Sequence, residues 1–125
     1  MANNKQQTTG GRGYWNVNET GLLALGNTSE ETVGSMLVQI VGTGLTGSFT
    51  VKGRLTGAHT GTNGYVPIPY RRRSLGGVAS DDTTVSAAIT GDALIVIEAD
   101  GLDIAIEVTA LSAGSAKVYV LPLRG

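Results

Sequence analysis

The chain of 125 residues contains no cysteine and only one histidine, His59. Without cysteine there is no disulfide framework, no thiolate nucleophile and no cysteine ligand for a metal. Nine Lys and Arg residues stand against ten Asp and Glu residues, which leaves a net charge of −1. A chain so close to neutral has no general attraction to nucleic acid or to an anionic membrane. We therefore expect neither nucleic acid nor a membrane as a partner.

Long hydrophobic runs are also absent from the sequence. No apolar segment approaches the roughly 18 residues that a membrane-spanning helix needs. The first residues, MANNKQQTTGGRG, are polar and lack the hydrophobic segment of a secretory signal peptide. We expect a soluble protein that does not use the general export route.

Glycine is abundant, with 19 residues, whereas only 15% of the residues are charged and 5% are aromatic. A composition rich in Gly, Thr, Val and Ala is typical of β-proteins with many turns. The length corresponds to one domain, and a domain of this size buries about two thirds of its unfolded surface. The chain can therefore fold without a metal or a disulfide.

Apolar residues alternate along several stretches, as they do in strands that bury one face. In residues 36–41, Met36, Val38 and Ile40 share a face. In residues 48–55, Phe, Val, Gly and Leu alternate with Ser, Thr, Lys and Arg. In residues 103–110, the residues predicted to point inward are Ile104, Ile106, Val108 and Ala110. Those predicted to point outward are Asp103, Ala105, Glu107 and Thr109.

Further strands are predicted where short apolar runs lie between turn-forming residues. A strand is expected in residues 22–26, an edge strand in 65–70, a short strand in 84–89, a central strand in 93–99 and a final strand in 116–123. Turns are expected in 42–47 and 111–115, and Asp100-Gly101 is typical of a tight hairpin.

These segments predict an all-β fold, a single antiparallel β-sandwich or jelly-roll-like domain of about seven to nine strands. Residues 1–13 have no apolar spacing, so we expect them to form no packed element and to be a flexible N-terminal arm. Residues 14–125 form the predicted sandwich domain. Fully extended, the arm would reach about 40 Å, which is enough to contact a neighbouring subunit.

Residues 42–47, GTGLTG, match the G-x-G-x-x-G pattern of dinucleotide-binding loops. Such a loop binds pyrophosphate only where it opens a helix whose N-terminal amides face the ligand. Here a strand pattern follows, and the region about 20 residues further on is YVPIPY, which has no acidic residue to hold a ribose. The glycines are interpreted as a hairpin connection with positive φ angles, and no cofactor is predicted.

Candidates for catalysis and metal binding are few. His59 has no nearby partner in the sequence that would make it a general base or a metal ligand. Asp81-Asp82 and the set Glu98, Asp100 and Asp103 offer oxygen ligands, but their spacing does not follow a calcium-binding loop. We predict no catalytic residue and no metal site, so the protein is not expected to be an enzyme.

Two groups of residues are candidates for a protein interface. Arg12, Tyr14 and Trp15 lie where the arm meets the domain, and aromatic residues at such a boundary can anchor it to a partner. Arg71, Arg72 and Arg73 form the one dense charge run. They are interpreted as a basic turn that forms ion pairs between subunits, with a solvated loop or contact with phosphate as alternatives.

Three segments together resemble the small β-sandwich structural proteins of tailed bacteriophages. These are GSFTVKGRLTG, NGYVPIPY and TGDALIVIEADGLDIAIEVTALSAGSAKVYVLPL, and the similarity extends over about residues 34–123. Tyr65 stands where tryptophan is common in such proteins, and Asp103 and Glu107 stand where arginine is common.

The resemblance implies a virion protein, most specifically a capsid decoration or cement protein that binds and stabilises the phage head lattice. Its partners would be the major capsid protein or other virion proteins. A homo-oligomer, a trimer by the same resemblance, would be assembled in the host cytoplasm. A tail, neck or fibre component is the alternative within this family. A carbohydrate-binding adsorption module is an alternative of another class, although the chain has only six aromatic residues to form sugar platforms.

Overall fold

The computed structural model describes residues 3–7, 13–27, 33–55, 61, 63–73, 83–85, 88–98 and 101–124. Within these residues it contains strands and no helix, and hence no helix long and apolar enough to cross a membrane. The strands are β1 (Asn4–Gln7), β2 (Gly13–Val17), β3 (Gly21–Asn27), β4 (Val33–Leu55), β5 (Val66–Pro67), β6 (Tyr70–Arg73), β7 (Thr83–Val85), β8 (Ala93–Glu98) and β9 (Leu102–Arg124). All of their pairings are antiparallel, so the predicted fold class is confirmed.

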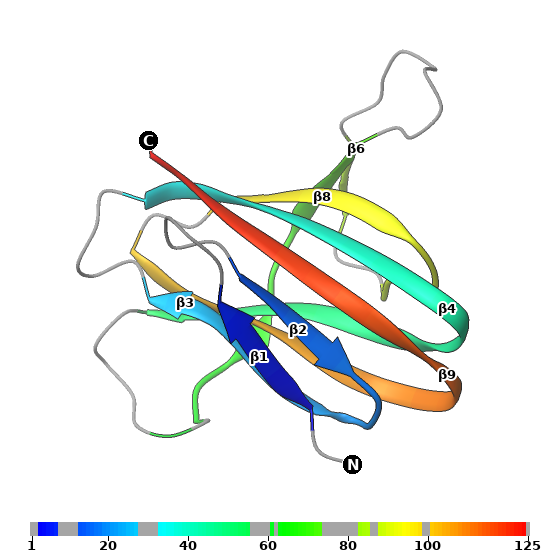
Figure 1. Ribbon diagram of the computed structural model, residues 1–125. Coiled ribbons are helices and arrows are strands. Elements are labelled where there is room, and N and C mark those ends of the chain that lie inside the picture. The colour runs from blue at the N-terminus through cyan, green and yellow to red at the C-terminus, as the bar shows by residue number, and fades with distance from the viewer. Residues whose placement is uncertain are drawn as a thin grey trace.

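Two strands of 23 residues each, β4 and β9, form the frame of the molecule. They pair from Val33 opposite Arg124 to Leu55 opposite Leu102, and both bend midway, so that the pair folds over on itself (Figure 1). One half of the pair lies in a first layer with β1, β2, β8, β6 and β7. The other half lies in a second layer, where β3 pairs with β9 and β5 pairs with β4. The result is a two-layered antiparallel sandwich.

The bend is made where glycines of the two long strands meet. Gly44 has φ +59° and Gly114 has φ +78°, and the pairing register shifts between Thr43 and Thr46. A Cβ atom on Gly114 would overlap the carbonyl group of Gly44 and come within 2.6 Å of the carbonyl oxygen of Thr43. Of the glycines in residues 42–47, for which positive φ angles were expected, Gly44 has one. The predicted turns at 42–47 and 111–115 are nevertheless wrong, because each strand continues through the bend.

The hairpin predicted at Asp100-Gly101 is also wrong. Strand β8 pairs with β4 and β6 in the first layer, whereas β9 begins in the second layer beside β3. The two strands do not pair with one another, so the chain crosses between layers here. Gly101 has φ +75°, and Asp100 lies outside the described residues.

The hydrophobic core fills the space between the two layers. The alternation predicted for residues 36–41 and 48–55 is confirmed, because Val38 and Phe49 are fully buried while their sequence neighbours face outward. Strand β8 is central, as predicted, and Val96 on its outer side is also buried. The largest fully buried side chains are Phe49, Leu23, Met36, Ile40, Ile89, Ile95, Ile97, Ile104 and Ile106.

The N-terminal residues extend the first layer. Strand β1 pairs with β2 from Asn4 opposite Asn16 to Gln7 opposite Gly13. Ahead of it, the Asn3 side chain accepts hydrogen bonds from the backbone N–H groups of Asn18 (2.8 Å) and Glu19 (3.1 Å). The prediction that residues 1–13 form no packed element is therefore wrong for residues 4–7.

Candidate protein-interaction surface

The outer face of the first layer is an apolar surface that the rest of the described chain does not cover. The pairing registers place its residues in rows across β2, β9, β4 and β8: Tyr14 lies opposite Tyr119, Tyr119 opposite Gln39, and Gln39 opposite Leu94. The next row joins Leu121, Leu37 and Val96. Val96 is buried, so the uncovered surface, which we call the tyrosine face, consists of Tyr14, Leu37, Gln39, Leu94, Lys117, Tyr119 and Leu121.

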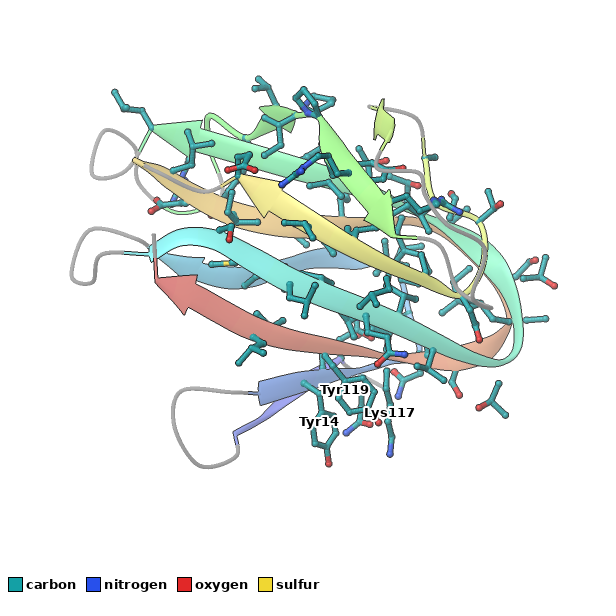
Figure 2. All side chains as sticks on the ribbon, turned by 90° about the horizontal axis from the view of Figure 1, so that it is seen from above. Tyr14, Lys117 and Tyr119 are labelled. Carbon is teal, nitrogen blue, oxygen red and sulfur yellow. The ribbon has the colours of Figure 1, made fainter. Side chains whose placement is uncertain are left out.

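A shallow groove of about 350 Å³ runs along the middle of the tyrosine face. Tyr14 and Tyr119 line one side, with ring centroids 5.4 Å apart and ring planes tilted by 38°. Figure 2 shows the two rings beside Lys117 at the edge of the layer near β1 and β2. Leu37, Leu94 and Leu121 complete the apolar lining. An uncovered apolar groove of this kind is typical of a contact with another macromolecule.

Charged groups lie outside the groove, in both directions along the strands. Lys117 Nζ lies 5.3 Å from the centroid of the Tyr14 ring, and no carboxylate of the described residues pairs with it. At the other end, Arg71 Nη2 donates to Glu98 Oε1 at 3.0 Å. The side chain of Glu98 is 72% exposed, which leaves it accessible to a further partner.

The outer face of the second layer differs, because its charges are paired within the chain. Lys52 forms an ion pair with Glu107, and Arg54 Nε lies 3.1 Å from Asp103 Oδ2. The hydroxyl groups of Ser48 and Thr109 are 2.8 Å apart. This face is polar and internally compensated, so the two outer faces are chemically unequal.

The burial of strand β9 departs from the prediction at three positions. Ile104, Ile106 and Val108 are buried as predicted. Asp103 and Ala105, which were predicted to be exposed, are buried too, and Ala110 is exposed. Asp103 is covered because Arg54 and the segment after β4 pack over it.

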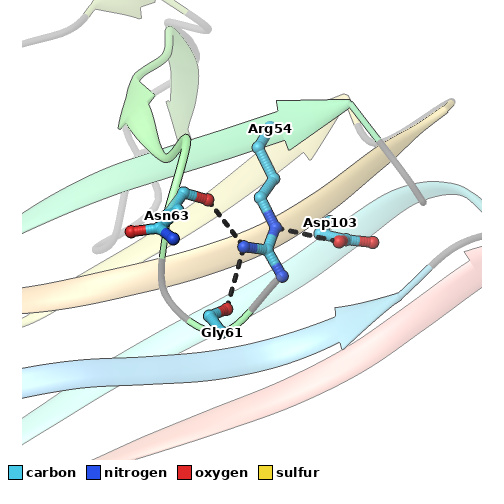
Figure 3. Close-up of polar contacts among 4 residues, drawn as sticks. All are labelled: Arg54, Gly61, Asn63 and Asp103. Atoms are coloured by element: carbon cyan, nitrogen blue, oxygen red, sulfur yellow. Dashed lines mark hydrogen bonds and ion pairs between the residues drawn. The ribbon is translucent and has the colours of Figure 1, made fainter. Parts of the chain in front are cut away.

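Arg54 fastens that segment to the sheet (Figure 3). Its Nη1 donates to the carbonyl oxygens of Gly61 (2.9 Å) and Asn63 (2.6 Å), and its guanidinium lies 4.3 Å from the centroid of the Tyr65 ring. Burial raises the pKa of Tyr65 above its ordinary value of 10.0, an effect that Arg54 opposes and Asp103 reinforces. Each contact of this cluster stabilises the fold, and none presents a reactive group to a cavity.

The predicted aromatic interface residues lie on opposite sides of β2. Tyr14 is on the tyrosine face, but Trp15 pairs with Val118, which is fully buried, and packs against the core. The alternation of the strand separates these two neighbours. Arg12 lies outside the described residues.

The predicted basic turn is a strand. Arg71, Arg72 and Arg73 belong to β6, where Arg71 lies opposite Val96 and borders the tyrosine face. The partner of Arg71 found here is Glu98 of the same chain, and the inter-subunit ion pairs stay a prediction. Arg72 is exposed on the other side of the strand, and the side chain of Arg73 is outside the described residues.

Of the residues that line the groove, the sequence reasoning named only Tyr14 as an interface candidate and missed Leu37, Gln39, Leu94, Tyr119 and Leu121. The alternation that puts Met36, Val38 and Ile40 on one face leaves Leu37 and Gln39 on the other, and residues 117–121 alternate in the same way. The signal was therefore present in the alternation. The sequence alone gave no means of knowing that these two segments are paired neighbours.

No group of three or more His, Asp or Glu side chains in the described part of the chain could hold a metal ion. His59, Asp81, Asp82 and Asp100 lie outside that part.

No protein-family model matches the chain, and no curated protein matches its sequence. Its fold is similar to the crystal structure of SPBc2 prophage-derived protein YomS, with a TM-score of 0.57 and 10% sequence identity. The match covers 98% of this chain and 96% of that chain. At this identity the likeness establishes a shared fold over nearly the full length of both chains.

Proposed function

We propose that this protein is a non-enzymatic structural component of a phage virion, and specifically that it decorates and stabilises the head lattice. The observation that carries the proposal is the fold shared, nearly from end to end, with a prophage-derived protein. The resemblance of residues 34–123 to small phage structural proteins supports the same origin independently of the fold.

The structure of the sandwich is suited to this role. The long paired strands β4 and β9 extend through both layers and make a rigid unit, because each half of one is hydrogen-bonded to a half of the other. One outer face is polar and internally paired, and the other carries the uncovered apolar groove. A rigid unit with one adhesive face can associate with a neighbouring subunit of an assembly, another copy included, and repetition over a lattice strengthens a weak single contact.

The test is to purify particles of the phage whose genome encodes this chain and to count its copies by quantitative mass spectrometry. A decoration protein is expected in a fixed ratio to the major capsid protein, with hundreds of copies on a typical head as an order of magnitude. Particles of a phage that lacks the gene should release their genome at a lower temperature than wild-type particles. Adding the purified protein should restore the heat resistance of these particles.

Two results would overturn the proposal. Absence of the protein from particles would exclude any virion role. A copy number of about 3 to 12, as expected for a single ring or spike, would place it in the tail, neck or fibre and exclude head decoration.

A further inference from the structure

We propose that the tyrosine face binds a second copy of this chain in a two-fold, face-to-face pair. This inference names the self-contact of the proposed virion protein. It is tested on the isolated protein, so it can fail while the virion role stands.

The argument begins with the positions of the charges along β4. Lys117 lies opposite Val41, and Glu98 lies opposite Ser35. Six residues of strand separate these two positions, which corresponds to about 20 Å. The apolar rows of the groove lie between them. The face therefore has at one end a cation without a carboxylate partner among the described residues, at the other end the exposed carboxylate of the Arg71–Glu98 ion pair, and an apolar centre.

Such an arrangement is complementary to itself. A two-fold axis that lies in the plane of the face, crosses β4 between Leu37 and Gln39 and is perpendicular to the line from Lys117 on β9 to Glu98 on β8 exchanges these two residues. It places Lys117 of one copy beside Glu98 of the other, and it does so twice because an isologous contact is reciprocal. The same axis places groove against groove, with Tyr119 and Leu94 near the centre.

The described residues also show why the second copy is preferred to another occupant. On the opposite face, Lys52 and Arg54 already have carboxylate partners within the chain. On the tyrosine face, Lys117 has none among the described residues, and Glu98 is mostly exposed although it binds Arg71. A second copy supplies a carboxylate for Lys117 and a further cation for the exposed carboxylate of Glu98 at once, whereas a uniformly acidic partner would repel Glu98.

The size of the face sets the expected strength of the pair. Four strands at about 4.8 Å spacing and four rows of side chains cover about 400 Å² per copy, or about 800 Å² in the pair. This is below the size of most stable interfaces, so we expect weak pairing, with a Kd of about 0.1 to 1 mM.

The experiment is a charge exchange followed by sedimentation equilibrium from about 10 µM to about 2 mM protein, a range chosen to span that Kd. The variants Lys117→Glu and Glu98→Lys should each weaken self-association about tenfold or more, because like charges then meet at both contacts. An equimolar mixture of the two should associate again as a heterodimer, since every contact in the mixed pair joins opposite charges. Tyr119→Glu should abolish association of either kind.

The double variant Lys52→Glu/Glu107→Lys is the matched control, because it exchanges an ion pair on the opposite face and should associate like the wild type. A wild-type protein that stays monomeric at about 2 mM would overturn the proposal. So would two single variants whose mixture does not associate. If the Tyr119→Glu protein failed to enter particles while the wild-type protein stayed monomeric, the tyrosine face would bind another virion protein. That result would overturn the proposal that it binds a second copy.

Discussion

At the scale of single residues, the two arginine–carboxylate pairs differ in how far they are removed from water. The side chains of Arg54 and Asp103 are 11% and 8% exposed, whereas those of Arg71 and Glu98 are 38% and 72% exposed. Arg54→Gln should therefore lower the free energy of unfolding by about 3 kcal/mol, because it leaves Asp103 buried without its partner. Arg71→Gln should change it by less than about 0.5 kcal/mol.

Urea denaturation of the two variants and the wild type measures this difference. Asp103 already has one carboxylate oxygen, Oδ1, without a hydrogen-bond partner among the described residues, so loss of Arg54 leaves both oxygens unpaired. Equal effects of the two substitutions would contradict this account.

Tyr65 is the residue whose titration should be visible in stability. Burial raises its pKa in the folded protein above the ordinary 10.0, so the folded state holds the phenol proton more tightly than the unfolded state. The contribution of the protonated Tyr65 phenol to the free energy of unfolding is fully present below pH 10.0. It is lost as the pH rises through the pKa of Tyr65 in the folded state. Denaturation between about pH 8 and 11 should show a smaller decline for Tyr65→Phe than for the wild type. Parallel curves would exclude the effect.

At the scale of elements, the sequence predicts strands well and their connections less well. The alternation at Met36, Val38 and Ile40 predicted correctly which side faces the core. It could not show that the glycines at 42–47 bend a continuous strand, because Gly44 would need a positive φ in a hairpin turn as well as in a bend. A bend is distinguished from a hairpin turn only by the pairing of β4 with β9, a distant strand that bends at the same place, at Gly114.

The bend gives a prediction with a control inside the same contact. Gly114→Ala should destabilise the protein by about 3 kcal/mol or more, because its Cβ would overlap the Gly44 backbone and its φ of +78° is unfavourable for alanine. Gly44→Ala should cost only about 1 kcal/mol, since it has a positive φ but no atom within 4 Å of the new Cβ. Urea denaturation of both variants measures the difference. If the two substitutions destabilised the protein equally, the positive φ angle alone would explain the need for glycine at both positions, and the close backbone contact at Gly114 would not matter.

At the scale of the whole molecule, composition and strand spacing were enough to predict a sandwich. They were insufficient to predict which residues form the candidate site, because a face is assembled from strands far apart in the sequence. Tyr14, Leu37, Leu94 and Tyr119 come from four strands. Their proximity depends on the long-range pairing of β4 with β9, which no local pattern reveals.

The position of β1 at the edge of the first layer gives the last prediction. Within the described residues the buried core comes from β2, β3, β4, β6, β8 and β9 and from Ile89, and β1 contacts the sheet through its pairing with β2. Deletion of residues 1–7 should therefore leave the sandwich folded and lower the free energy of unfolding by only about 1 to 2 kcal/mol.

The same deletion removes the strand that covers the edge of β2, whose unpaired N–H and C=O groups can then pair with other chains. Light scattering should show aggregation of the truncated protein, and deletion of residues 1–2 alone, which retains Asn3 and β1, should not cause it. A far-ultraviolet spectrum without β structure would show instead that β1 is required for folding. A folded and monodisperse truncated protein would contradict the protective role of β1 at this edge, since β2 would then resist association without it.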